Sequence, residues 1–119
     1  MRFKFEKLLI WQKAMDFGEE LNLSTSNFPQ KELYNLTSQM MRAVDSIALN
    51  ISEGSIEQSK PEFSRFMGYA LRSLAEVVTC LHKANRRQYY SEDQFNLYYD
   101  QAYELMNMMI AFRKKISNT

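Results

Sequence analysis

The 119-residue chain is poor in the residues that break helices or build special sites, with 3 Gly, 2 Pro, 1 Cys and 1 His. So little Gly and Pro disfavours a fold with many tight turns and favours a few long helices. A single cysteine, Cys80, excludes an intramolecular disulfide. No apolar run approaches the roughly 20 residues that cross a bilayer, and residues 1–7 lack the apolar core and cleavage site of a signal peptide. We therefore expect a cytoplasmic protein without membrane contact.

The chain also has almost no net charge. Lys plus Arg number 15 and Asp plus Glu number 14, which leaves +1 at neutral pH. This balance gives no global reason to bind nucleic acid, so any such reason must come from how the charges are placed. Apolar packing material is plentiful instead, since 45% of the residues are hydrophobic, with 8 Met, 8 Phe and 7 Tyr. Length and composition together indicate one domain, residues 1–119.

Three breaks divide the chain into four segments. Capping and turn residues occupy positions 24–29, a second break runs from Gly54 to Ser59, and a third precedes Ser91. Ser59 and Ser91 are each followed three residues later by Glu or Gln, the pattern of a capping box at a helix N-terminus. We expect Gly54 to end the second helix in the left-handed conformation. The sequence therefore predicts helices over about 5–23, 31–53, 60–87 and 92–116.

Apolar residues in these segments recur at spacings of three and four, the period of a helix with one buried stripe. The stripe is clearest in the fourth segment, where it comprises Phe95, Tyr98, Ala102, Leu105, Met109, Phe112 and Ile116. In the second segment we expect Leu33 on the buried side. Connections this short force neighbouring helices to run antiparallel. The predicted fold is all-α, an antiparallel up-and-down four-helix bundle.

The last two segments carry more apolar surface than one core needs. The surplus residues are Tyr99, Tyr103, Met106 and Ile110 in the fourth helix, with Leu71, Ala75 and Val78 in the third. A monomer rarely leaves a large contiguous apolar patch in water. We therefore predict that the chain associates with itself through these residues. The alternative is a broad core face with tolerated surface tyrosines.

The sequence has no recognisable catalytic or cofactor site. A di-iron bundle needs Glu-x-x-His pairs, but His82 is the only histidine and residue 79 is Thr. One Cys and one His are too few ligands for zinc, and Cys80 and His82 point in different directions on a helix. Phosphate loops, nucleophile elbows and HExxH sequences are absent. We expect a non-enzymatic protein with no catalytic residue, no metal and no cofactor.

A polar stripe runs along the second helix. It comprises Gln39, Arg42, Ser46, Asn50 and Glu53, and faces Arg72, Ser73 and Glu76 at matching heights on the third helix. We expect a polar layer between the two helices, in which Arg42 reaches Glu76. The alternative is a solvated face, the usual place for charge on a helix.

Basic residues gather at one end of the predicted bundle, where the first helix starts, the fourth ends and the second meets the third. They are Arg2, Lys4, Lys7, Lys60, Arg65, Arg113, Lys114 and Lys115. Four Glu residues lie at the same end, so its charge is mixed. Cations in the last turn of a helix are expected from the helix dipole alone. An oligomer would multiply this weak patch, which makes it the candidate surface for nucleic acid.

Several short motifs occur in a recognisable order. They are Trp11-Gln12-Lys13-Ala14, Phe28-Pro29, Leu36-Thr37-Ser38-Gln39, Arg42-Ala43, Ser46-Ile47, Asn50-Ile51-Ser52-Glu53-Gly54 and Ser73-Leu74-Ala75-Glu76. In combination the chain resembles the four-helix bundle family named for proteins encoded in intervening sequences of bacterial 23S rRNA genes. The accessory variability determinant of diversity-generating retroelements is a relative. The resemblance implies a bacterial homopentamer that acts near RNA, DNA or a reverse transcriptase, without known catalysis.

The resemblance also implies roles for individual residues. The matching positions, which would fix the second and third helices and their turn, are Gln39, Arg42, Ser46, Asn50, Glu53, Gly54, Ser73 and Glu76. Met41 departs from the pattern, since a second Arg is expected beside Arg42. The leading hypothesis is a non-enzymatic, homo-oligomeric scaffold that binds nucleic acid or a nucleic-acid-handling protein. The alternative is a protein–protein interaction module without nucleic-acid contact.

Overall fold

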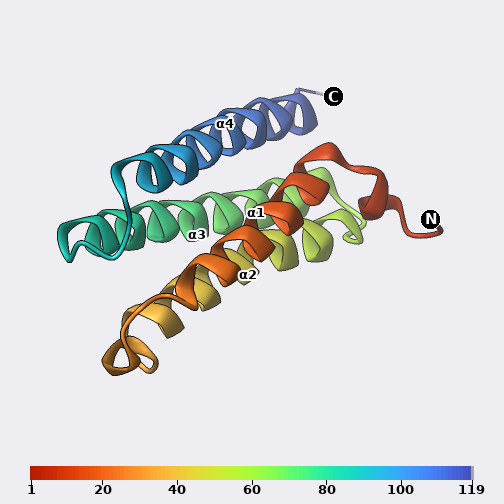
Figure 1. Cartoon of the computed structure of the whole chain (residues 1–119). Helices are drawn as coiled ribbons and strands as arrows, with labels where there is room; N and C mark the ends of the chain where they lie inside the picture. The colour runs from red at the N-terminus through yellow and green to blue at the C-terminus, as the bar shows by residue number, and fades with distance from the viewer. Residues whose placement is uncertain (119) are drawn as a thin grey trace.

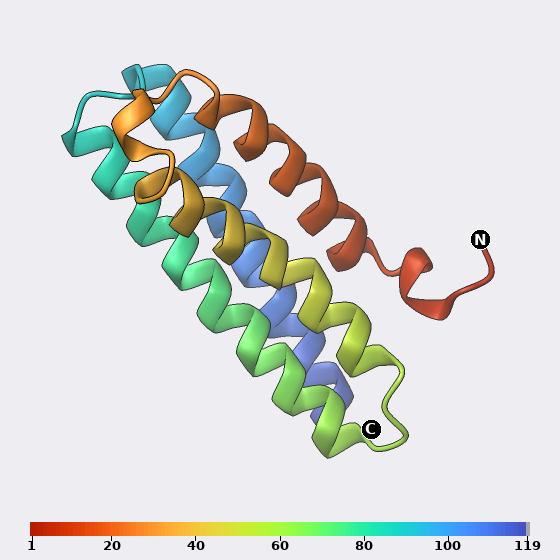
Figure 2. The same ribbon diagram turned by 90° about the horizontal axis from the view of Figure 1, so that it is seen from below.

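Four long helices make up most of the computed structural model, which describes residues 1–118. They are α1 (Leu9–Thr25), α2 (Leu36–Ser55), α3 (Lys60–Arg86) and α4 (Glu92–Ser117), with short 3-10 helices η1 (Lys4–Lys7) and η2 (Gln30–Glu32). Each long helix runs antiparallel to the next in an elongated bundle of 45 × 24 × 22 Å (Figures 1 and 2). α3 packs against both α2 and α4, and α1 lies mainly against α2. The predicted four-helix bundle is confirmed.

The first two helices begin later than predicted. Residues 4–7 form η1, and Leu8 is extended (φ −76°, ψ 125°) before α1 begins at Leu9. α2 begins at Leu36 instead of residue 31, because residues 30–32 form a 3-10 turn and Asn35 has non-helical angles (φ −126°, ψ −102°). Leu33 therefore lies outside α2 and is 43% exposed, not buried as expected. α3 and α4 end within one residue of their predicted bounds.

The two predicted capping boxes have different outcomes. At the start of α4, Ser91 Oγ accepts a hydrogen bond from the Gln94 amide (3.1 Å), and Gln94 Oε1 accepts one from the Ser91 amide (3.0 Å). At the start of α3, Ser59 Oγ accepts from the Glu62 amide at 3.3 Å. The Glu62 carboxylate pairs with Arg65 at 2.8 Å instead of returning to the cap. The box at α4 is complete, whereas only half of the box at α3 forms.

Gly54 does not end α2 in the left-handed conformation. The helix continues to Ser55, and within residues 1–118 the positive φ belongs to Gln88 (63°). A Cβ on Gly54 would lie 2.7 Å from the Cβ of Phe66 and 2.9 Å from Cδ1 of Phe63. The glycine is needed because α2 and α3 approach each other closely here, next to the turn that joins them.

The core lies along the inner side of α3. The fully buried residues of this helix, each with 0% exposure, are Met67, Ala70, Leu74, Val77, Leu81 and Ala84. α2 and α4 cover them with residues such as Ile47, Ile51 and Met109, which also have no exposed surface. Large side chains of this kind stabilise a fold by about 1.5–3 kcal/mol each on full burial. The predicted stripe of α4 faces this core, fully buried at its centre and half-buried at its ends.

A buried carboxylate ties together the two connections at one end of the bundle. Glu32, in η2, is only 4% exposed. Its Oε2 accepts hydrogen bonds from the Tyr89 hydroxyl (2.6 Å) and from Arg87 Nη1 (2.9 Å), and its Oε1 accepts one from Asn35 Nδ2 (3.0 Å). Tyr89 and Arg87 belong to the α3–α4 connection, so Glu32 joins segments more than 50 residues apart in sequence. No sequence pattern predicted this cluster.

Aromatic packing reinforces the same end. Phe28 contacts the tilted ring of Tyr89 and packs edge to face with Tyr90, with ring centroids 5.2 and 5.4 Å away. The Tyr90 hydroxyl reaches Ser24 Oγ at 2.7 Å. Burial raises the pKa of Tyr90 to about 12. The neutral phenol therefore persists at all ordinary pH values and keeps this contact.

Two glycine substitutions should have opposite effects on stability. Gly54→Ala places a Cβ against two phenylalanines, and we expect it to lower the free energy of unfolding by about 1–3 kcal/mol. At Gly18, within α1, a Cβ would meet Val44 at an ordinary 3.9 Å. Gly18→Ala should raise stability by about 0.5–1 kcal/mol, because alanine suits a helix interior better. Urea denaturation at one fixed protein concentration measures both changes, and equal effects at the two sites would refute the close approach at Gly54.

The Glu32 cluster should make the free energy of unfolding depend on pH in the acidic range. The Tyr89 hydrogen bond lowers the pKa of Glu32, helped by Asn35 and Arg87, while desolvation opposes them. A carboxyl with a lower pKa in the folded state stabilises the fold above its unfolded pKa, and that contribution is lost as pH falls through the folded pKa. We expect Glu32→Gln to destabilise the protein at neutral pH and to flatten the loss of stability below about pH 4.5. Urea denaturation across a pH series tests this, with exposed Glu57→Gln as control; an unchanged acid dependence in Glu32→Gln would contradict it.

Candidate functional site

The surplus apolar residues of α3 and α4 lie outside the core of the chain. On α4, Tyr99 is 41% exposed, Tyr103 56% and Ile110 40%. Met106 is half-buried and packs against the core, as do Leu71 and Val78 of α3. The second stripe is therefore exposed at Tyr99, Tyr103 and Ile110, and partly buried at its other large residues. We call the surface formed by these six residues and Ala75 the α3–α4 outer face.

Two contacts fix the register of this face. The His82 and Tyr99 rings lie 5.9 Å apart, and Gly68 meets the Arg113 guanidinium nearer the other end. Between these contacts, steps of four, three and four residues along α3 match equal steps in the opposite direction along α4. Antiparallel helices of equal pitch therefore place three pairs at the same level. These pairs are Val78 with Tyr103, Ala75 with Met106 and Leu71 with Ile110. The residues predicted at the interface thus follow one another without a gap along the α3–α4 outer face.

Five of the positions that match the family pattern lie on a groove of about 420 Å³ between α2 and α3. They are Gln39, Arg42, Ser46, Ser73 and Glu76. Of the remaining three, Asn50 donates to the Ser46 carbonyl (2.8 Å), Glu53 is exposed and Gly54 contacts α3. The expected contact between the two helices is direct at Gly54. Elsewhere the polar residues border a cleft.

The expected polar layer between α2 and α3 does not form. Within residues 1–118 no ion pair joins Arg42 to Glu76, and both side chains are exposed. Ser46 Oγ donates to the Arg42 carbonyl of its own helix at 2.9 Å. The physical reason is that small residues such as Ala43 and Ser73 occupy the helix contact, which leaves the long polar side chains at its solvent edge. The solvated face, named as the alternative, describes Arg42 and Glu76.

The predicted basic end is only partly assembled. Lys60, Arg65 and Arg113 line one surface depression of about 500 Å³ with Ser64 and Ser117. Arg65 is paired with Glu62, and Arg113 Nε donates to Ser64 Oγ at 3.2 Å. Lys4 lies near Lys60 on an adjoining depression. The others, Arg2, Lys7, Lys114 and Lys115, are exposed.

α3 is the basic element that the sequence reasoning did not single out. It carries Lys60, Arg65, Arg72, Lys83 and Arg86 against Glu62 and Glu76. Two of these cations flank one aromatic ring, with the guanidinium carbons of Arg65 and Arg72 at 5.9 and 5.8 Å from the centre of Tyr69. Counting charges by helix would have revealed this surplus.

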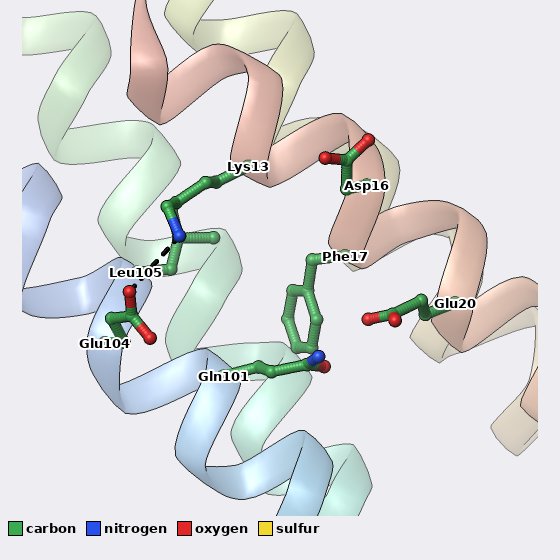
Figure 3. Close-up of a pocket in the computed structure, with 7 residues that line it drawn as sticks. All are labelled: Lys13, Asp16, Phe17, Glu20, Gln101, Glu104 and Leu105. Carbon is green, nitrogen blue, oxygen red and sulfur yellow. Dashed lines mark hydrogen bonds and ion pairs between the residues drawn. The ribbon is translucent and has the colours of Figure 1, made fainter.

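An acidic pocket of about 250 Å³ lies between α1 and α4. Figure 3 shows Asp16 and Glu20 extending from α1 on either side of Phe17, with Gln101 below the ring. Lys13 pairs with Glu104 across the pocket at 3.2 Å, but both side chains are largely exposed. Such an ion pair contributes little to stability, about 0–1 kcal/mol. Among residues 1–118 no group of three His, Cys, Asp or Glu side chains is arranged to hold a metal ion.

The fold is a helical bundle, and its distinctive features are exposed surfaces along the contacts between neighbouring helices. A protein of unknown function from the S23 ribosomal protein family of Bacteroides thetaiotaomicron has a similar crystal structure. The two chains superpose with a TM-score of 0.81 at 22% identity, over 89% of this chain and 96% of the other. This likeness shows a shared fold. No curated protein matches the chain in sequence.

The sequence itself assigns the family. Residues 6–111 match the profile of the 23S rRNA-intervening sequence proteins, and the chain belongs to this family. The resemblance drawn from its motifs is therefore confirmed. The family's description names no reaction. Within residues 1–118 no helix combines the length and apolar character needed to span a bilayer.

Proposed function

We propose that the protein is a non-enzymatic scaffold whose subunits associate through the α3–α4 outer face. The observation that carries this proposal is the continuous seam with Tyr99, Tyr103 and Ile110 at 40–56% exposure. Removing the exposed part of such side chains from water contributes roughly 1 kcal/mol each, about half of the value for full burial. Association must also offset the loss of translational and rotational freedom. A continuous face of seven residues can meet this cost, whereas one exposed tyrosine cannot.

The proposed assembly gives the scattered basic residues a function. In one subunit they are too few, and too mixed with acids, for strong attraction to phosphate. Repetition around an oligomer multiplies each patch, and the attraction between summed charges and nucleic acid grows accordingly. The resemblance implies five copies in a bacterial cytosol. The proposed ligand is RNA or DNA, held by the basic end and the cationic surface of α3, or a protein that handles nucleic acid.

The alternative function is a protein–protein interaction module without nucleic-acid contact. The near-neutral charge of +1 favours it, as does the pairing of Arg65 with Glu62. The two functions differ in salt dependence, because binding to phosphates releases counterions and weakens steeply as salt rises. An assembly that does not bind structured RNA or duplex DNA even at low salt would support the alternative.

Tyr103→Glu should disrupt the assembly without unfolding the subunit. Tyr103 is 56% exposed, so a charge there costs the monomer little but is strongly unfavourable in an apolar interface. We expect sedimentation velocity to show an oligomer for the native chain and a shift towards the monomer for the variant. Leu97→Glu is the matched control, since Leu97 is 51% exposed and lies about 120° around α4 from Tyr103. A monomeric native protein would overturn the proposal.

Lys60→Glu with Lys114→Glu should weaken binding to a structured RNA hairpin and make it less sensitive to salt. For every phosphate that the variant no longer neutralises, the slope of log K against log salt should fall by about 0.7–0.9. Fluorescence anisotropy across a salt series provides the measurement. Lys31→Glu with Arg42→Glu is the control, because it makes the same change in net charge at two exposed cations that lie outside both the basic end and α3. Equal weakening by both pairs would locate the binding surface elsewhere.

A further inference from the structure

A second unpartnered apolar surface lies between α1 and α2, away from the α3–α4 outer face. It is a groove of about 410 Å³, which we call the α1–α2 groove. Small residues line it, namely Ala14 and Gly18 from α1 and Ala48 from α2, and larger apolar side chains, Trp11, Met15 and Leu49, surround them. Met15 is 42% exposed and Leu49 58%. Figure 2 shows α1 and α2 side by side, and Phe5 of η1 also lines the groove.

The shape of the groove suits a helix. Its α1 lining extends from Trp11 to Glu19, about 12 Å at 1.5 Å per residue, or roughly two helical turns. A Cβ on Gly18 would meet Val44 of α2 at 3.9 Å, so this buried glycine lies where the two helices approach each other at the floor of the groove. Recognition by helix-in-groove docking uses such a cleft, with apolar anchors spaced three or four residues apart. Met15 can adapt to the bound anchors, and Trp11 offers a broad apolar surface.

Two carboxylates give the groove its chemical preference. Glu19 and Asp45 line it together, one from each helix. Burial raises the pKa of Asp45, and the nearby negative charge of Glu19 raises it further. Among residues 1–118 neither carboxylate forms a salt bridge. Cations from a ligand would relieve this like-charge pair.

The charge pattern disfavours the α4 stripe of a second copy as the occupant. The exposed apolar stripe of α4 has the right length, but Asp100 and Glu104 adjoin its tyrosines. Docking that stripe would bring like charges against Glu19 and Asp45, which is destabilising at an interface. An occupant with Lys or Arg beside its apolar residues meets both requirements of the groove.

We infer that the α1–α2 groove binds an amphipathic helix of a partner protein, one that presents apolar anchors flanked by Lys or Arg. This inference rests on the proposed scaffold function and names the chemistry of its protein partner. The groove shares no residue with the α3–α4 outer face. The two surfaces can therefore be engaged at the same time, one by other subunits and the other by the partner. Failure of one proposal is thus distinguishable from failure of the other.

A pair of synthetic peptides tests the inference. One is an amphipathic helix of roughly 18 residues with Leu anchors and flanking Lys, and the other has Glu in place of every Lys. Trp11 is the only tryptophan of the chain and lines the groove, so its emission reports occupancy. We expect a saturable shift with the Lys peptide and at least about tenfold weaker binding of the Glu peptide. No saturable shift, or equal affinity for both peptides, would overturn the proposal.

Matched variants locate the binding site. Glu19→Gln with Asp45→Asn should reduce affinity for the Lys peptide by about tenfold, because two charge pairs are removed. Asp16→Asn with Glu20→Gln makes the same change on the α4 side of α1 (Figure 3) and should have little effect. Equal reductions would show attraction to net charge alone. Leu49→Glu examines self-association: if it alters sedimentation of the protein alone, a second copy occupies the groove and the partner helix is refuted.

Discussion

The apolar stripe of α3 is the constraint on which the rest of the bundle depends. Met67, Leu74, Val77 and Leu81 have no exposed surface, so this helix must be covered along its length by two neighbours. The short connections assign those neighbours in chain order, α2 before it and α4 after it. α1 then completes the bundle against α2, with weaker contact to α4. α2 and α3 supply most of the buried hydrophobic residues, while the outer sides of the helix pairs keep apolar side chains in water.

The surfaces of the two helix pairs differ in the sign of their charge. α1 and α2 together carry Asp16, Glu19, Glu20, Asp45 and Glu53 against Lys13 and Arg42, whereas basic residues predominate on α3. The overall charge of +1 hides this separation. An acidic groove on one side and a cationic helix on the other attract different ligands, because complementary potentials select partners and orient encounters. A near-neutral chain can therefore still discriminate between a basic protein and a nucleic acid.

The spacing of residues along the chain predicted those structural features that depend on residues close in sequence. The four helices, the cap at Ser91 and the second stripe on α4 all follow from spacings of three and four. The Glu32 cluster could not be predicted this way, because its carboxylate meets Tyr89 and Arg87 only after the chain has folded. Gly54 was recognised as important for the wrong reason, since its backbone is helical and the constraint is the nearness of Phe66. The α1–α2 groove was missed because small residues and two carboxylates produce no periodic signal.

Both ends of the bundle are fixed by contacts between distant segments. At one end Glu32 joins the two connections. At the other Gly54 brings α2 against Phe63, whose ring also packs on Phe112 of α4 at 5.6 Å. Helices held at both ends present their outer faces in one geometry, so a partner does not have to order them on binding. When the helices are already fixed in this way, even a small surface can bind a partner, because less of the association free energy is lost in immobilising side chains and helices. The proposed scaffold function therefore requires only the outer surfaces of the two helix pairs.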